Sequence, residues 1–249
     1  MGRMYPMRRQ KIWQWMTLTD MGLEAKIVTA VALLERIRNE FAPATLASSL
    51  GAEDMVLTDL VAKHAPNISI FSLDTGRLNP ETYDLLAKVQ ESYGSKIKIE
   101  VYYPQANAIQ FFVESNGINA FYNSVELRKA CCGIRKVEPL KRALAGKKAW
   151  ITGMRRSQSA DRANLPDQEW DADHGLTKFN PLAEWSEKEV WEYIRSNDIP
   201  YNELHDRHYP SIGCAPCTRS IAMGEDIRAG RWWWENEGAK ECGLHVKKI

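Results

Sequence analysis

Apolar residues recur at spacings of three and four along several stretches of the chain, the pattern of helices with one buried face. The pattern is clearest over 23–41, on the apolar positions Ile27, Ala30, Val31, Leu34 and Ile37. It predicts further helices over 54–64, 80–93 and 134–145, with two more helical stretches between 102 and 131. Short apolar runs with the length of buried strands lie between them, at 44–48, 68–73, 97–102 and 149–152.

Strands that alternate with helices of this length predict an α/β fold with a doubly wound, mainly parallel sheet. A chain of 249 residues suits one such domain, and the sequence contains no internal repeat. In these sheets, ligands bind beyond the carboxyl ends of the strands. The loops that follow the predicted strands are therefore the first candidates for a binding site.

Charge and composition narrow the class of partner. The 33 Lys and Arg against 32 Asp and Glu give a formal charge of +1, which does not indicate a nucleic-acid partner. No stretch approaches the about 18 apolar residues of a membrane span. No apolar run follows the basic first ten residues, as it would in a secretory signal. We therefore expect a cytoplasmic protein with no membrane partner, where clustered cysteines usually indicate metal or redox chemistry.

Three predicted strand-end loops carry candidate ligand-binding residues. The first contains Ser48, Ser49 and Gly51, small residues before a helix N-terminus, although a serine-rich helix cap has the same composition. The second is the turn Leu73, Asp74, Thr75 and Gly76, where Asp74 could simply cap the turn. The third contains Gly153, Arg155, Arg156, Gln158 and Arg162. Its three arginines suit a multiply charged anion, and a solvated charge cluster is the alternative.

Four of the five cysteines form two tight clusters, Cys131-Cys132 and Cys214-Ala-Pro-Cys217. Two such pairs predict a four-thiolate metal or iron–sulfur centre, while buried inert thiols or a disulfide are the alternatives. Adjacent cysteines direct their side chains differently, so they rarely ligate one tetrahedral ion together. A cubane cluster offers each thiolate its own iron, and the adjacent pair therefore favours iron–sulfur over zinc.

The fifth cysteine, Cys242, stands near the C-terminus beside Gly243 and close to His245. An accessible thiol near a proton acceptor is a candidate nucleophile, with His245 as a candidate for positioning or deprotonating it. Arg228 and Arg231 are three residues apart, so on a helix they would share one face. Such cations would offset the repulsion between a thiolate and an anionic substrate. The neighbouring run of three tryptophans indicates packing or an interface.

Together these motifs resemble the assimilatory adenosine 5′-phosphosulfate (APS) reductases of the iron–sulfur type, within the family of 3′-phosphoadenosine 5′-phosphosulfate (PAPS) reductases. The matching segments are 48–54, 73–76, 131–140, 152–162, 214–217 and 241–245, and the double-cysteine segment and Glu-Cys-Gly-Leu-His are highly specific. Reductases of the 3′-phosphorylated nucleotide share the terminal motif but usually lack the other four cysteines. The resemblance therefore implies APS as substrate.

The resemblance also implies a fold like that of the PP-loop adenine nucleotide alpha hydrolases, over 1–218, followed by a mobile C-terminal tail over 219–249. Cys131, Cys132, Cys214 and Cys217 would bind a 4Fe–4S cluster, with Lys136 between the cluster and the substrate anion. Leu73 and Gly153 would meet the adenine through their backbones, and Arg155, Arg156 and Arg162 the phosphosulfate. Arg228 and Arg231 would close over the substrate with the tail.

The implied reaction has two steps, in which Cys242 attacks the sulfur of APS and reduced thioredoxin, or a glutaredoxin-like donor, then releases sulfite. The resemblance further implies a homo-oligomer. Two other classes of protein remain open from the residues. One is a PP-loop ATPase that adenylates a nucleic acid, although the Ser-Gly-Gly-x-Asp-Ser loop of such enzymes is missing. The other is a zinc-bound nucleotide sensor, which would not need Cys242.

Overall fold

A computed structural model of the protein describes residues 22–159 and 162–235. Its centre is a six-stranded sheet in the order β3-β2-β1-β4-β6-β5. The parallel strands are β1 (Ala44–Ala47), β2 (Ser69–Leu73), β3 (Ile99–Tyr102), β4 (Ala149–Ile151) and β6 (Leu176–Phe179). The edge strand β5 (Gln168–Asp171) is antiparallel to β6. The chain moves outward from β1 to β3 and then returns to the other side of β1, so the strand order reverses between β1 and β4.

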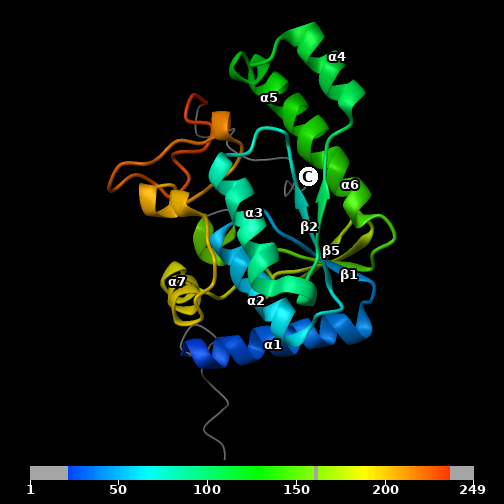
Figure 1. The fold of residues 1–249 in the computed structure, drawn as a ribbon, viewed down its shortest axis with the longest axis vertical. Coiled ribbons are helices and arrows are strands. Elements are labelled where there is room, and N and C mark those ends of the chain that lie inside the picture. The colour runs from blue at the N-terminus through cyan, green and yellow to red at the C-terminus, as the bar shows by residue number, and fades with distance from the viewer. Residues whose placement is uncertain (1–21, 160–161, 236–249) are drawn as a thin grey trace, which may run out of the picture.

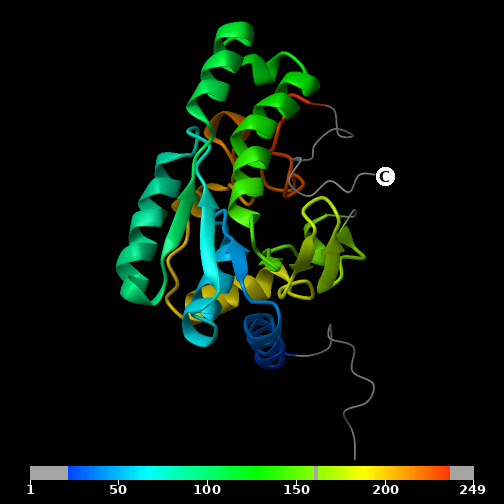
Figure 2. The same ribbon diagram turned by 90° about the vertical axis from the view of Figure 1, so that its right-hand side faces the viewer.

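Helices cover both faces of the sheet (Figures 1 and 2). One face packs against α1 (Leu23–Glu40), α2 (Ala52–His64), α3 (Pro80–Tyr93) and α7 (Glu187–Ser196). The other face packs against α6 (Glu138–Leu144). Because side chains alternate along a strand, Ile70 points into the larger core while its neighbour Phe71 points toward α6. The helices α4 (Ala106–Asn116) and α5 (Val125–Cys132) extend from one end of this sandwich.

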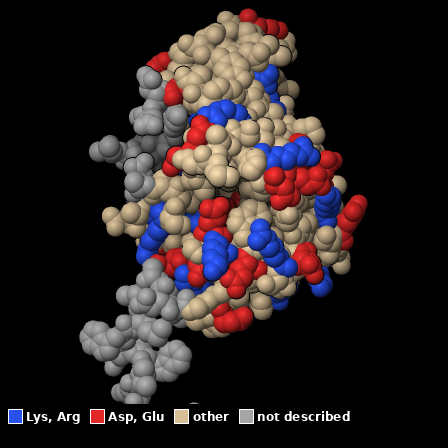
Figure 3. All heavy atoms as spheres, turned by 90° about the vertical axis from the view of Figure 1, so that its left-hand side faces the viewer, with Lys and Arg blue, Asp and Glu red and all other residues tan. Residues whose placement is uncertain are grey.

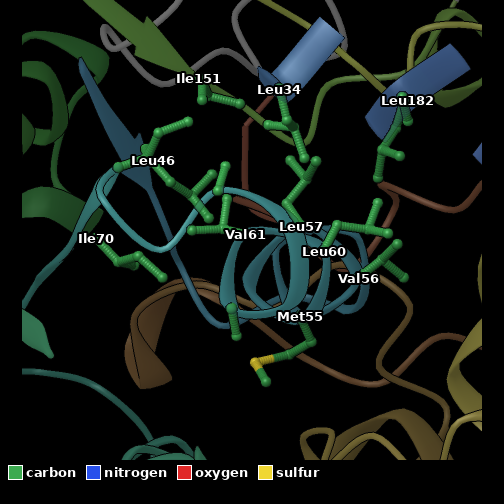
Figure 4. Close-up of a cluster of buried hydrophobic side chains, with 14 of the residues drawn as sticks. Leu34, Leu46, Met55, Val56, Leu57, Leu60, Val61, Ile70, Ile151 and Leu182 are labelled. Atoms are coloured by element: carbon green, nitrogen blue, oxygen red, sulfur yellow. The ribbon is translucent and has the colours of Figure 1, made fainter. Parts of the chain in front are cut away.

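The helix α2 lies in the middle of the larger core and is buried on nearly every side (Figure 4). Met55, Val56, Leu57, Leu60 and Val61 are all 0 % exposed. They contact residues of α1 and of the strands, including Leu34, Leu46 and Ile151. This packing fixes the N-terminus of α2, and with it the loop between β1 and α2, against the ends of the strands.

The predicted fold class is confirmed, and the predicted strands and the first three helices lie within a few residues of the observed ones. The segment predicted as one helix over 134–145 is instead a π-helical turn, Gly133–Val137, followed by α6. Pro139 has no N–H and cannot donate to the carbonyl one turn earlier, which favours a wider turn here. The sequence also missed the hairpin of β5 and β6, because β5 is short, polar and half exposed.

The surface of the described residues contains both signs of charge. On the face that carries α7 and the segment after it, acidic and basic side chains are intermingled and the upper part is largely uncharged (Figure 3). No helix of the described part is both long enough and apolar enough to cross a membrane.

Candidate active site

A cavity of about 290 Å³ opens at the carboxyl ends of β1, β2 and β4, beside the point where the strand order reverses. We call it the strand-end cavity. Its walls include residues from all three predicted loops, namely Ser48, Ser49, Gly51, Leu73, Thr75, Gly153, Gln158 and Arg162. The position is the one where doubly wound sheets bind their ligands.

The loop between β1 and α2 is folded back on the helix by Asp54. Its carboxylate oxygen Oδ2 accepts hydrogen bonds from the backbone N–H and the hydroxyl of Ser49, both 2.7 Å long. Burial raises the pKa of Asp54 to about 6, and the bonds from Ser49 oppose this rise. A Cβ atom on Gly153 would lie only 2.5 Å from Oδ1 of Asp54. The loops after β1 and β4 therefore meet at a distance that requires glycine, leaving backbone groups at the cavity wall.

The loop after β2 divides its predicted residues between two tasks. Leu73 and Thr75 line the cavity, whereas Asp74 and Gly76 do not. The buried carboxylate of Asp74 accepts from the N–H of Gly76 at 2.7 Å and from the hydroxyl of Tyr83 at 2.9 Å. Gly76 has φ of 70°, which suits the turn. Asp74 and Gly76 thus shape the loop, as the alternative reading of the turn expected.

The arginines of the third loop also separate. The guanidinium of Arg155 is buried and lies 2.7 Å from Oε1 of Glu53. Arg156 pairs with Glu184 and donates to the carbonyl of Leu165. Neither arginine lines the strand-end cavity, so the structure gives both a supporting position where the sequence predicted contact with an anion. Arg162 does line it, and donates to Gln158 at 2.5 Å.

The four clustered cysteines come together, as the sequence predicted. Cys131 and Cys132 end α5, Cys214 and Cys217 flank a short 3-10 turn, and all four line a small second cavity of about 20 Å³, the cysteine cavity. Burial raises the pKa of Cys131, and burial together with the nearby Cys214 raises the pKa of Cys217 to about 12. Four thiolates in this apolar environment would need a strongly positive ligand.

The donor set and walls of the cysteine cavity suit a multi-iron cluster better than one ion. Among the described residues, no three His, Cys, Asp or Glu side chains converge closely enough to hold a single metal ion. Arg77, Arg128, Arg135 and Lys136 also line this cavity and would offset the charge of an anionic cluster. Nε of Arg135 and Nε1 of Trp232 are buried donors without a partner in the described part of the chain. Such donors commonly face the sulfur atoms of clusters.

The two cavities share three wall residues: Lys136, Cys214 and Trp232. Lys136 belongs to the π-helical turn directly after the first cysteine pair. A cation at this position lies between the four thiols and a ligand in the strand-end cavity, as the sequence resemblance implied for Lys136.

Arg228 and Arg231 both line the strand-end cavity, but they do not share a helix face. Arg228 lies in a turn, and Arg231 forms an antiparallel bridge with Thr218. The helical spacing expected for this pair was wrong, because Gly230 lets the backbone approach Arg219 more closely than a helix would allow. A Cβ atom at Gly230 would lie 2.3 Å from the carbonyl oxygen of Arg219.

Some functional residues escaped the sequence analysis, and two predicted ones lie beyond the structure. Cys242 and His245 fall outside the described residues. Asp54 stood inside the first predicted loop but was not singled out. Trp232 was read as packing only, and nothing in the sequence pointed to His205, which lines the strand-end cavity. Burial lowers the pKa of His205, and its Nε2 has no partner among the described residues.

The fold and the position of the cavity define a nucleotide-binding protein of the PP-loop-like adenine nucleotide alpha hydrolase class. A solved PAPS reductase from Candida auris superposes with a TM-score of 0.66 at 28 % identity, covering 83 % of this chain and 99 % of that one. An FMN adenylyltransferase from Candida glabrata has the same fold, with a TM-score of 0.53 at 15 % identity over 89 % of this chain and 79 % of its own.

The phosphoadenosine phosphosulfate reductase domain matches residues 43–220, and the chain belongs to that family. A protein named adenosine 5′-phosphosulfate reductase from Allochromatium vinosum is 55 % identical, over 94 % of this chain and 90 % of its own. One of the same name from Burkholderia cepacia is 53 % identical, over 91 % and 90 % respectively. The resemblance seen in the motifs is thus confirmed along most of the chain.

Proposed function

We propose that this protein is a thioredoxin-dependent APS reductase that converts adenosine 5′-phosphosulfate to AMP and sulfite, in sulfate assimilation and cysteine biosynthesis. The observation that carries the proposal is the shared wall of the two cavities, where Lys136 and Cys214 border both the four thiols and the strand-end cavity. The names of the 55 % and 53 % identical relatives support the choice of substrate.

In the first step, the thiolate of Cys242 attacks the sulfur of APS. A sulfur–sulfur bond forms, the sulfur–oxygen bond to the phosphate breaks, and AMP leaves with that electron pair. Lys136, Arg228, Arg231 and Arg162 line the cavity and would stabilise the charge on the phosphosulfate and on the departing phosphate. AMP is a good leaving group, so positioning and cations supply most of the catalysis.

In the second step, a thiolate of reduced thioredoxin attacks Sγ of S-sulfonated Cys242. Sulfite leaves with the electron pair of the sulfur–sulfur bond, and a mixed disulfide remains. The second thiol of thioredoxin then resolves this disulfide, so that thioredoxin is oxidised and Cys242 returns as a thiolate. A glutaredoxin-like donor would act in the same way.

The position of Cys242 in the sequence supports this scheme. Ten residues separate it from Trp232, which lines the strand-end cavity. An extended chain of ten residues spans at most about 35 Å, so the thiol can reach the cavity and also meet a protein partner outside it.

Cys131, Cys132, Cys214 and Cys217 would hold a 4Fe–4S cluster. Its contribution in this proposal is electrostatic and structural, transmitted to the substrate side through Lys136. Reduction of the cluster should then leave the rate of S-sulfonation unchanged, and obligatory redox cycling of the cluster would contradict this part of the proposal. We place the enzyme in the cytoplasm, where its thiols stay reduced, as a homo-oligomer.

The test is the intact mass of the anaerobically purified protein after incubation with APS and no reductant. We expect a gain of one sulfonate group, lost on addition of reduced thioredoxin and absent in Cys242→Ser. PAPS, run in parallel, measures the preference for the nucleotide without the 3′-phosphate. If neither nucleotide modifies Cys242 in iron-loaded protein, the covalent mechanism fails, and ATP consumption would be tested next for the ATPase alternative.

A further inference from the structure

Residues 228–235 form a strap that is held by both halves of the cysteine site. On one side it follows the segment of Cys214 and Cys217, with a hydrogen bond from the N–H of Trp232 to the carbonyl of Cys217 at 3.2 Å. The N–H of Arg219 donates to the carbonyl of Gly230 at 3.0 Å, next to the bridge between Thr218 and Arg231. The strap thus runs antiparallel to the residues that follow the second cysteine pair.

On the other side, the strap is joined to α5 by a buried ion pair. Nε and Nη2 of Arg128 donate to Oε1 and Oε2 of Glu235 at 2.9 and 2.8 Å. The two side chains are 1 % and 3 % exposed. Arg128 precedes Cys131 by three residues, so it lies one helical turn before the first cysteine pair. Figure 2 shows the strap, in red, against this green helix.

Trp232 connects this pair to the strand-end cavity. The guanidinium groups of Arg128 and Arg231 each lie 4.7 Å from its ring, so the indole contacts a cation from the cysteine helix and one from the cavity wall. Trp232 has φ of 43°, a left-handed conformation that a bulky residue adopts only when its surroundings impose it. The contacts of the strap therefore determine where Arg231 stands.

We infer that Arg128 and Glu235 are positioning residues for substrate binding: their pair docks the strap on the cysteine helix and thereby holds Arg228 and Arg231 in the strand-end cavity. A buried ion pair adds little net stability compared with apolar side chains, but a two-point contact fixes direction. The state of the cysteine site then affects nucleotide affinity through the strap, without contact between Arg128 or Glu235 and the nucleotide. The inference rests on the proposed function for the identity of the ligand.

The experiment is the affinity of iron-loaded, full-length Glu235→Gln for AMP, measured by calorimetry, with the iron content determined on the same samples. We expect AMP to bind at least about tenfold more weakly, the equivalent of losing one hydrogen bond to a charged group, at unchanged iron content. Arg128→Lys keeps the charge in α5 but loses the two-point contact, so it should show the same loss. It replaces Glu235→Gln if that variant does not fold.

The matched control is Glu189→Gln, which breaks the buried pair of Glu189 with Lys26 between α1 and α7, away from both cavities. It should unfold more easily yet bind AMP within about twofold of the unchanged protein. A second control, Arg231→Ala, removes a cation of the cavity itself. If Arg231→Ala loses AMP affinity while Glu235→Gln and Arg128→Lys keep it, the strap inference is overturned. If all three keep it, the fault lies in the proposed nucleotide site.

Discussion

The hydroxyl oxygen of Thr75 lies 3.2 Å from the sulfur of Cys214, a buried contact between residues that are 139 positions apart in the chain. Thr75 also accepts a hydrogen bond at its carbonyl, 2.6 Å from Nη1 of Arg135. The loop after β2 is thus tied to the second cysteine pair by its side chain and to the π-helical turn after the first pair by its backbone. The strand-end cavity and the cysteine cavity therefore share a rigid boundary.

Lys136 lies on that boundary, so we expect its charge to matter more for the reaction than for binding or folding. Lys136→Met should slow S-sulfonation of Cys242 by about 100-fold, the usual loss when one group that stabilises developing charge is removed. Rapid-quench mass spectrometry with APS measures the rate. The exposed Lys141→Met on α6 is the control and should react normally. Equal rates for the two variants would remove Lys136 from the mechanism.

Two arginines of the third loop should differ sharply. Arg162 lines the strand-end cavity, whereas Arg156 is paired with Glu184 outside it. Arg162→Ala should weaken AMP binding about tenfold, and Arg156→Ala should change it less than about twofold. Calorimetric titration of both variants makes the comparison. A larger loss for Arg156→Ala would restore the role that the sequence suggested for it and contradict the geometry.

The case of these arginines shows what a single sequence can and cannot predict. The strands and their loops were predictable because apolar runs and their spacing are local signals. The partner of Arg155 is Glu53, 102 residues away, and only the tertiary fold brings them together. The pattern of charges therefore indicated an anion site but not which of its members were already paired.

The cysteines and the end of the chain show the same division. Two tight clusters predicted a common centre, since few other arrangements explain them in a reducing environment. The strap, by contrast, carries residues at helical spacing, and its close approach to Arg219 depends on a packing contact of Gly230 that no local rule signals. The edge strand β5 was missed for the related reason that its polar residues have no apolar face to reveal.

Asp54 should make stability depend on pH. Burial raises its pKa from 3.8 to about 6, so between these values the folded protein binds a proton that the unfolded chain has lost. This contribution to stability is complete below pH 3.8 and disappears as the pH rises through 6. From pH 7 to 5, the free energy of unfolding should therefore rise by about 1 kcal/mol more than in Asp54→Asn. Urea unfolding at both pH values measures it, with the exposed Asp84→Asn as control. Parallel profiles for all three proteins would show that Asp54 does not titrate in this range.

Gly153 is where the loops after β1 and β4 meet, and a methyl group there has no space. The added Cβ would lie 2.5 Å from Oδ1 of Asp54 and 2.9 Å from Cβ of Glu53. Gly153→Ala should thus cost about 1–3 kcal/mol of stability by overpacking and push the loop of Ser48 and Ser49 out of place.

Because the displaced loop lines the strand-end cavity, AMP affinity should fall together with stability in Gly153→Ala. Denaturant unfolding and calorimetric titration give the two quantities. Gly22→Ala is the matched control, since a Cβ atom at Gly22 meets nothing within 4 Å. It should lose less than about 1 kcal/mol of stability and no affinity. If Gly153→Ala bound AMP as tightly as this control, the meeting of the two loops would not shape the nucleotide site.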